Sequence, residues 1–402
     1  MALLSVADAL ALVLAQALPL PTEQVPLADA VGRVLTADLA ALRTQPPADV
    51  SAMDGYAVRG EDVAAATVLR VIGEVAAGRL FDRAIGPGEA ARIFTGAVMP
   101  TGTDTVVIQE VTCRDGDSVA IKRAEGKGRN VRRLGFDFKA GDVLLEKGRR
   151  LSVRDIALAG AMNHAMVPVH RRPRVAVLAT GDELVEPGTP PAPGQIVHSN
   201  GIALAAIARG EGADAADFGI VPDRLDATIA AVRRARDAQV DVLVTSGGAS
   251  VGDYDFVQQA FAAEGIALSF WKVALRPGRP LMHGKLDGMQ VLGVPGNPVS
   301  AYVCSVLFLA PLLRRLAGRT DVSLPRESAV LGCALAANDE RADYMRATLE
   351  CRSDGTKIAT PFRAQDSSLL ASLAHAQCLV VREPFAPAAE QGSPCVILNL
   401  QF

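Results

Sequence analysis

Between Arg174 and about Gly318, expected strands and expected helices alternate along the chain. Short β-branched runs bounded by glycine or proline predict the strands, and longer apolar patterns predict the helices between them. The expected strands are 174–180, 216–221, 240–245 and 290–294, and the expected helices are about 200–210, 225–237, 255–264 and 299–317. This order predicts a doubly wound, mostly parallel α/β sheet, in which ligands bind outside the carboxyl ends of the strands.

A glycine-rich stretch follows the third expected strand and reads V-L-V-T-S-G-G-A-S-V-G-D-Y-D from Val242 to Asp255. Glycines let backbone N–H groups approach an anion closely, serine hydroxyls add donors, and the next helix offers its positive end. Asp253 and Asp255 add the hard oxygen ligands that a divalent cation prefers. A tight strand-to-helix connection is the plain alternative. The expected phosphate cradle comprises Ser246, Gly247, Gly248 and Ser250.

The other three expected strand ends also carry small, acidic or glycine-rich motifs. They read T-G-D-E-L (180–184), V-P-D-R (221–224) and V-P-G-N-P-V-S (294–300). Any one aspartate in such a position can cap a helix, and for Asp223 capping is the favoured alternative. Four such ends at one sheet edge favour a site for phosphate and a divalent cation.

Two basic segments lie outside these strand ends. The segment S-F-W-K-V-A-L-R-P-G-R-P-L (269–281) predicts a hairpin with Lys272, Arg276 and Arg279 at its turn, where both arginines can face one anion. The segment G-K-G-R-N-V-R-R-L-G (126–135) holds four basic side chains. A solvated loop is the commoner meaning of such a run, and a grip on phosphate is the alternative because guanidinium groups match phosphate geometry.

The rest of the chain divides into regions that differ in predicted secondary structure. Short strands punctuated by glycine predict a β-rich inserted module, and a second set near the C-terminus predicts a small β-barrel or sandwich. The expected domains are a helical and linker subdomain of 1–44 with 138–172, the module of 45–137, the sheet domain of 173–320 and the barrel of 321–402. The first 20 residues form a helix that can instead pack on the sheet domain, and 20–44 reads as a loop-rich connection.

Composition narrows the class of protein. The net charge of -3 gives no general attraction to nucleic acid or to an anionic membrane,. Six cysteines are scattered without a C-x-x-C pair, which predicts reduced thiols in a cytoplasmic protein,. No Lys or Arg precedes Arg33, which argues against a signal peptide,. The apolar run 299–313 is shorter than the roughly 18 residues of a membrane span and predicts a buried helix.

Five ordered motifs resemble one family. S-A-M-D-G-Y-A, F-T-G-A-V-M-P-T-G-T-D-T-V-V, T-G-D-E-L-V-E-P-G, S-G-G-A-S-V-G-D-Y-D and P-G-N-P-V-S are similar to those of the MoeA family, the molybdopterin molybdenumtransferases related to the gephyrin E domain. The resemblance implies an elongated homodimer with four subdomains per chain. It also implies insertion of molybdate into adenylylated molybdopterin with loss of AMP, with Mg²⁺ as the divalent cation and with other molybdenum-cofactor biosynthesis proteins as possible partners.

The resemblance assigns roles residue by residue. It implies catalytic roles for Asp54, Thr95, Asp137, Glu183, Asp223 and Asp255, of which Asp54, Glu183, Asp223 and Asp255 would bind the metal. The implied substrate-binding residues are Ser246, Gly247, Gly248, Ser250, Lys272, Arg276, Arg279, Pro295, Gly296, Asn297, Pro298, Arg132 and Arg133. It further implies that the module of one chain completes the cleft of its partner.

Three positions depart from the family pattern. Phe136 stands in G-F-D where G-E-D is common, arginines replace the lysines of K-P-G-K-P in the segment 276–280, and His198 replaces an acidic or amide residue before Ser199-Asn200. These departures leave room for a divergent paralogue. A molybdopterin adenylyltransferase and a non-catalytic scaffold are the other two interpretations, and the matched N-terminal module and the retained acids argue against them.

Overall fold

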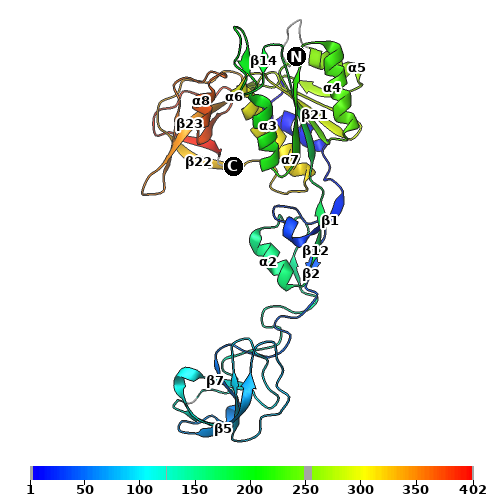
Figure 1. Ribbon diagram of the computed structural model, residues 1–402. Coiled ribbons are helices and arrows are strands. Elements are labelled where there is room, and N and C mark those ends of the chain that lie inside the picture. Colours follow the sequence, from blue (N-terminus) through cyan, green and yellow to red (C-terminus); the bar gives the residue numbers. More distant parts are fainter. Residues whose placement is uncertain (1–2, 124, 249–255, 401–402) are drawn as a thin grey trace.

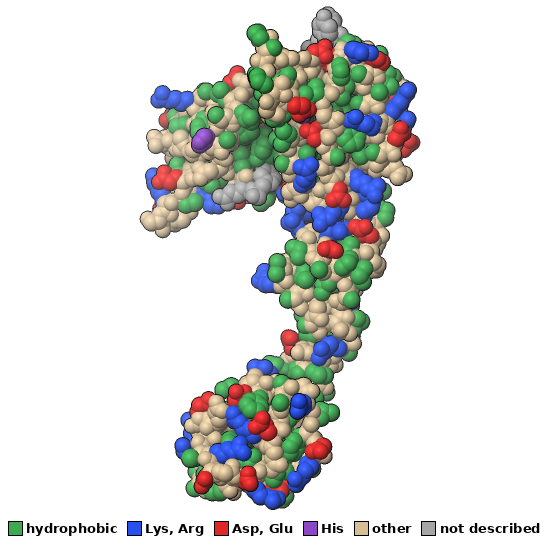
Figure 2. All heavy atoms as spheres, in the orientation of Figure 1, with side chains coloured by type: hydrophobic (Ala, Val, Ile, Leu, Met, Phe, Trp, Pro, Cys, Tyr) green, Lys and Arg blue, Asp and Glu red, His purple; other side chains and the backbone are tan. Residues whose placement is uncertain are grey.

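The chain is elongated, with separate hydrophobic cores along its length (Figure 1). The structure is a computed structural model that describes residues 3–123, 125–248 and 256–400. The sheet domain and the C-terminal barrel lie at one end, a small middle subdomain follows, and the β-rich module forms the other end. Lys and Arg side chains gather where the sheet domain meets the middle subdomain, and charges of both signs mix over the module (Figure 2).

The sheet domain confirms the predicted α/β fold. Its six strands lie in the order β16-β13-β17-β21-β20-β18, and the first four are mutually parallel. Strand β20 is antiparallel to both of its neighbours. The strands are β13 (Arg174–Thr180), β16 (Asp214–Val221), β17 (Val242–Ser246), β18 (Ala267–Trp271), β20 (Met282–Leu286) and β21 (Met289–Val294).

Helices cover both faces of this sheet. They are α1 (Val6–Ala15), α3 (Asn200–Gly210), α4 (Leu225–Asp237), α5 (Phe256–Ala263), α6 (Pro298–Cys304) and α7 (Ala310–Leu316), with a π-helical turn η4 (Ser305–Leu309) between the last two. One core includes α1, α3 and the run α6-η4-α7, and the opposite core includes α4 and α5. The helical stretch Pro298–Leu316 has 19 residues and is therefore longer than the apolar run 299–313. Its most apolar part is 89% buried, as expected for a core helix.

The segment 269–281 folds back as the expected hairpin: β18 pairs with β20, and the N–H groups of Lys272 and Val273 donate to the carbonyls of Leu281 and Arg279. The tip of the hairpin differs from a simple turn, because β19 (Leu275–Arg276) pairs with the C-terminal barrel. A separate two-stranded pair, β14 (Leu184–Val185) with β15 (Ile196–Val197), stands beside the carboxyl edge of the sheet. The tip of the hairpin therefore ties the barrel to the sheet domain.

The middle subdomain contains paired strands where the sequence suggested a loop-rich connection. Its elements are β1 (Thr22–Pro26) paired with β12 (Met166–His170), β2 (Leu39–Ala40) paired with β11 (Val143–Leu145), and α2 (Val153–Ala161). Helix α2 begins with a capping box, in which Ser152 and Asp155 exchange hydrogen bonds with each other's backbone N–H,. Distant segments of the chain thus share one small core.

The module is a six-stranded mixed sheet in the order β7-β4-β6-β5-β9-β8. Its strands are β4 (Gly55–Val58), β5 (Val68–Val75), β6 (Glu89–Ile93), β7 (Thr105–Ile108), β8 (Thr112–Asp115) and β9 (Ser118–Ile121). The chain enters and leaves the module through β3 (Val50–Ser51) and β10 (Val131–Arg132), which pair with each other. The two connections therefore run side by side.

The C-terminal strands confirm the predicted β-barrel. It closes because β23 pairs with both β24 and β25. The barrel elements are β22 (Arg326–Leu331), β23 (Ala342–Cys351), β24 (Lys357–Pro361), β25 (Cys378–Arg382) and β26 (Pro394–Asn399), with α8 (Leu370–Ala374) at the side of the sheet domain. The loop before α8 thereby reaches the sheet domain.

A buried ion-pair cluster links α3 to α7. Glu211 accepts from Arg314 through both carboxylate oxygens, at 2.7 and 2.6 Å, and from Arg319 at 2.9 Å. All three side chains are less than 10% exposed. Removing one partner of a buried pair leaves the other charge uncompensated, which is costly.

We therefore expect Glu211→Gln to lower the free energy of unfolding of the sheet domain by about 3–5 kcal/mol. The exposed pair of Arg224 with Asp226 provides the matched control, and Asp226→Asn should cost about 1 kcal/mol or less. Differential scanning calorimetry of the full chain measures both changes. Equal, small shifts in the two variants would contradict this account.

Candidate functional site

A cavity of about 760 Å³ lies at the carboxyl edge of the parallel strands (Figure 1). Its wall combines the ends of β13 and β17, the β14–β15 pair, the loop 295–298 before α6, and Ser368 and Leu370 of the barrel. The predicted residues that line it are Glu183, Asp223, Ser246, Gly247, Gly248, Pro295, Gly296, Asn297 and Pro298. The structure thus brings residues from all four strand ends to one cavity, with Asp223 as the predicted residue that follows β16.

Two backbone loops approach each other closely in this wall. A side chain on Gly247, whose φ is +92°, would place its Cβ 2.6 Å from the carbonyl oxygen of Thr180. A Cβ on Gly296 would lie 3.5 Å from the Cα of Gly247. Asn200 holds the loops together, since its Nδ2 donates to Ser246 Oγ at 2.8 Å and to the Gly296 carbonyl at 2.7 Å. The positive φ and the close approach to Thr180 require glycine at 247, whereas a Cβ at 296 would make an ordinary van der Waals contact,.

Acidic side chains lie beside the cavity. The Asp223 N–H donates to Asp182 Oδ1 at 3.1 Å, and the Asp182 N–H donates to Asp223 Oδ2 at 3.4 Å. Burial raises the pKa of Asp223, and the negative charges of Asp182 and Glu183 raise that pKa further, against the lowering effect of the Asp182 N–H,. Arg224 occupies the N-cap of α4, so the helix-cap alternative for Asp223 is wrong.

The predicted residues of the module lie at the other end of the chain from the cavity (Figure 1). Asp54 Oδ1 accepts from the N–H and the hydroxyl of Thr95, at 2.7 and 2.8 Å. These two bonds, and the charge of Arg92, lower the pKa of Asp54. Asp137 is exposed, and its N–H donates to the Gln45 carbonyl at 3.0 Å. Asp54 and Thr95 therefore form one unit with a fixed, ionised carboxylate.

One chain does not gather the four carboxylates predicted to bind metal. Asp54 lies in the module, whereas Glu183 and Asp223 lie at the cavity. Asp255 lies outside the described residues, as do Asp253 and Ser250 of the predicted phosphate loop. Within the described parts of the chain, no three His, Cys, Asp or Glu side chains form a group that could hold a metal ion.

Arg276 does not point outward with Arg279 toward one anion. Its guanidinium donates to Asp343 at 2.7 Å, to Asp339 at 2.9 Å and to the Asn338 amide oxygen at 2.9 Å. The hydrogen bond to Asp343 is the main cause that raises the pKa of Arg276. The prediction failed because the acids that pair with Arg276 lie more than 60 residues later, in the barrel.

The other basic residues differ in their surroundings. Lys272, with a φ of +88°, places Nζ 4.2 Å from the centroid of the Trp271 ring. Arg279 is exposed in the segment that ends at Pro280 in the cavity wall. In the run 126–135, three cations pair with carboxylates: Lys127 with Asp104 at 3.4 Å, Arg129 with Glu125 at 3.0 Å, and Arg133 with Asp49 at 2.6 Å. Arg132 is exposed and pairs with no carboxylate among the described residues.

Sequence reasoning missed the contribution of the barrel to the cavity. Asn297 Nδ2 donates to Ser367 Oγ at 2.8 Å, and Ser368 lines the cavity. The loop that carries both serines is held by Arg346, which is 1% exposed and donates to the Asp366 carbonyl at 2.9 Å. The polar stretch Q-D-S-S reads as an ordinary turn, so the sequence offered no signal for this contact.

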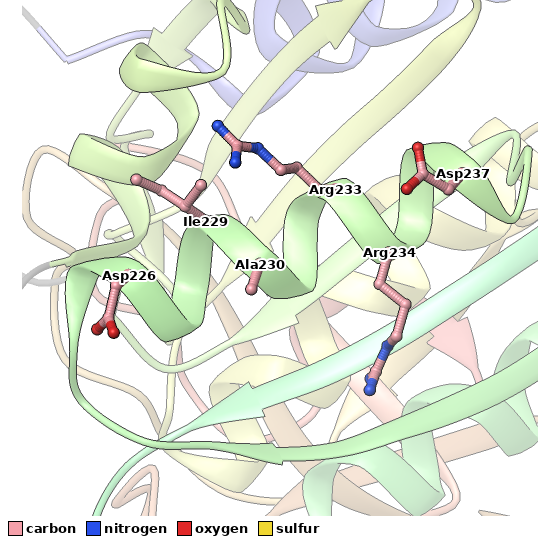
Figure 3. Close-up of a pocket in the computed structure, with 6 residues that line it drawn as sticks. All are labelled: Asp226, Ile229, Ala230, Arg233, Arg234 and Asp237. Carbon is pink, nitrogen blue, oxygen red and sulfur yellow. The ribbon is translucent and has the colours of Figure 1, made fainter.

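A second depression, of about 560 Å³, lies on the outer face of α4 (Figure 3). All six side chains that line it come from this one helix. Arg233 pairs with Glu264 at 2.8 Å, and Arg234 lies over the Phe218 ring at 4.4 Å. Both arginines are engaged by residues outside the depression, and the described lining comes from a single helix, so this surface is not the candidate site.

Three family models match the chain in order. The MoeA N-terminal region (domain I and II) matches residues 4–162, the probable molybdopterin binding domain matches residues 176–315, and the MoeA C-terminal region (domain IV) matches residues 328–400. Most of the cavity wall lies within the second match. The fold and the site therefore define a protein of the molybdopterin-binding class.

Relatives cover nearly all of the chain. Molybdopterin molybdenumtransferase 2 of Mycobacterium tuberculosis is 40% identical over 83% of this chain and 85% of its own length. The molybdopterin molybdenumtransferase of Haemophilus influenzae is 35% identical over 91% of this chain and 90% of its own length. The crystal structure of the molybdopterin biosynthesis MoeA protein from Pyrococcus horikoshii matches with a TM-score of 0.86 and 30% identity over 100% of both chains. The chain belongs to the MoeA family.

The raised pKa of Asp223 predicts its response to a divalent cation. Because the folded-state pKa exceeds the unfolded value, Asp223 stabilises the fold at low pH, and this stabilisation is lost as the pH rises through the raised pKa,. At pH 7.5 without metal, Asp223→Asn should therefore melt at the same temperature as the wild type or higher. Added MgCl₂ should raise the melting temperature of the wild type more than that of the variant.

Differential scanning fluorimetry with and without MgCl₂ makes this measurement, and Asp226→Asn is a matched control on the same helix end. Asp226 pairs with exposed Arg224, away from the cavity wall. Its variant should keep the wild-type response to MgCl₂. An identical shift in wild type and Asp223→Asn would remove Asp223 from the metal site.

Proposed function

We propose that the chain inserts molybdate into adenylylated molybdopterin and releases AMP. The observation that carries this proposal is the cavity at the sheet edge, within the match to the probable molybdopterin binding domain. The curated relatives named molybdopterin molybdenumtransferase support the same reaction. The substrate carries a pyrophosphate, and Ser246, Gly247 and Gly248 of the glycine-rich stretch line the cavity where a phosphate group would lie,.

The acids at the cavity fit a magnesium ion. Magnesium usually binds proteins through one or two carboxylates together with substrate phosphates, so a group of three protein ligands is unnecessary. Glu183 and Asp223 would supply these carboxylates, and like-charge repulsion already raises the pKa of Asp223. When bound, the metal would neutralise the phosphate charge during the cleavage that releases AMP.

The remaining predicted residues would bind and orient the substrate. Ser246, Gly247 and Gly248 would hold phosphate oxygens, with Asn200 fixing their loop against Gly296. Asp54, ionised and fixed by Thr95, would orient the attacking molybdate or its metal-bound water. Lys272, Arg279 and Arg132 remain candidates for anion binding, because none of them pairs with a described carboxylate.

We further propose a homodimer with composite clefts. The described lining of the cavity contains no Lys or Arg, whereas the exposed Arg132 of β10 and the carboxylate of Asp54 before β4 belong to the module. A symmetric dimer would bring the module of one chain to the cavity of the other. A cytoplasmic location belongs to the same proposal, because the dithiolene of the substrate needs a reducing compartment. Other molybdenum-cofactor biosynthesis proteins would supply the substrate and receive the product.

AMP release from adenylylated molybdopterin tests the reaction. We expect release by the wild type to depend on both MgCl₂ and molybdate, and to fall at least tenfold in Asp54→Asn, equivalent to about 1.4 kcal/mol in the barrier. Asp54 is half-buried, and the amide oxygen of an asparagine can still accept both hydrogen bonds from Thr95, so the thermal midpoint of this variant should hardly change,. Release of pyrophosphate from ATP and molybdopterin, without AMP release, would instead identify an adenylyltransferase.

Complementation tests the composite cleft. In a mixed dimer of Asp54→Asn and Glu183→Gln chains, one cleft would carry both substitutions and the other would carry neither. Random reassortment of equal amounts should therefore restore about a quarter of the wild-type activity. Mixing each variant with itself is the control. Two inactive variants that stay inactive after verified subunit exchange would show that each cleft is built within one chain.

A further inference from the structure

His198 forms part of the cavity wall and is almost completely buried, at 1% exposure. It follows β15, and its N–H donates to the Val185 carbonyl of β14 at 2.8 Å. The ring nitrogen Nε2 lies 3.2 Å from Asp217 Oδ2. The other ring nitrogen, Nδ1, has no hydrogen-bond partner among the residues that the structure describes. A buried polar atom without a partner costs free energy, so this one calls for an explanation.

The position of the ring is fixed on two sides. A Cβ on Gly201, in the first turn of α3, would lie 2.5 Å from His198 Nε2, so only glycine leaves room for the imidazole there. Asp217, in β16, is itself held, because its Oδ1 accepts from the Gly219 N–H at 2.9 Å. The side chain is therefore held firmly between a helix and a strand of the sheet domain.

The hydrogen bond to Asp217 determines the chemistry that remains at Nδ1. An ionised carboxylate only accepts, so Nε2 must carry the proton in this pair. Nδ1 is then a bare acceptor in the neutral ring or a second N–H donor in the imidazolium. In the imidazolium, the Nε2–H is already bonded to Asp217, and the Nδ1–H is left for an acceptor outside the chain.

The charges around the cavity make such a donor useful. Glu183 and Asp223 line the cavity, Asp182 lies next to Asp223, and the described lining contains no Lys or Arg. His198 is the basic side chain of this described lining. An anionic ligand in the cavity therefore has His198 as its available cationic donor from the same chain.

We propose that His198, as an imidazolium backed by Asp217, donates its Nδ1–H to an anionic oxygen of the ligand in this cavity. The ligand class is an oxyanion, either a phosphate group or molybdate. The inference rests on the proposed function and adds to it a residue that stands where an acidic or amide side chain is usual in the family. Nδ1 is shielded from solvent, and the Nε2 edge of the ring is held by Gly201 and Asp217, so the proposal requires the β14–β15 pair to move aside when the ligand binds.

The test compares the wild type with His198→Gln and Asp217→Asn. A glutamine at 198 can still donate to Asp217 through its amide, but it is uncharged and places an acceptor oxygen, not an N–H, on the side where Nδ1 stands. An asparagine at 217 keeps an acceptor without the negative charge. His164→Gln, in the middle subdomain, is the matched control, since His164 Nε2 contacts the Ala40 carbonyl far from the cavity. Isothermal titration with molybdate and, separately, with inorganic phosphate in the presence of MgCl₂ measures the affinities.

We expect His198→Gln to bind the preferred oxyanion about tenfold more weakly, Asp217→Asn to lie between it and the wild type, and His164→Gln to match the wild type. The titration that responds identifies which oxyanion His198 contacts. In ¹⁵N-histidine NMR spectra of the wild type, the ring signals that His198→Gln removes should shift on saturation with that anion. A purely structural role would lower the melting temperature of the variant and leave those signals in place.

Unchanged affinity for both anions in His198→Gln, or unmoved His198 ring signals at saturation, would overturn the proposal. These outcomes are separable from failure of the proposed reaction. Wild-type AMP release with unaltered anion binding in the variant would reject only the role of His198. Anion-dependent ring shifts in a chain that releases no AMP would retain that role and reject only the reaction.

Discussion

The close approach of two backbone loops at the edge of one parallel sheet is the constraint on which the cavity depends. Gly247 and Gly296 allow strand ends that are about 50 residues apart to come into van der Waals contact. Asn200 then bridges both loops with a single amide group. The acids, the barrel serines and His198 are all placed relative to this contact, so the geometry of the site follows from the packing of the sheet.

Charge is distributed unevenly along the molecule. Acids surround the cavity, whereas the exposed Arg132 and the fixed carboxylate of Asp54 lie in or beside the module. In the run 126–135, nearby acids already neutralise three cations. The described cavity lining of one chain therefore offers carboxylates and a buried histidine but no Lys or Arg, and the proposal of a second chain rests on the cations that this end lacks.

Sequence periodicity predicted the sheet domain and the position of its ligand edge, because strand and helix patterns are local and their order determines which ends converge. The ends at Glu183, Gly247 and Gly296 were predicted correctly as neighbours. Arg276 was misjudged because its acidic partners come from a distant barrel strand. The barrel serines and the Asp217 partner of His198 were missed for the same reason, since long-range side-chain contacts leave no local pattern.

The pairing of Gln45 with Phe138 has a mechanical consequence. Both connections to the module run through this narrow neck before they reach β3 and β10, which are bonded to the module or packed against it, and the module has hydrophobic cores of its own. A twist of the neck would swing the module as one stiff arm, and its length would amplify a small rotation at the base into a large displacement at the tip. Asp54 and Thr95 would keep their mutual geometry during such a swing, so the half-site can open or close toward another surface without being dismantled.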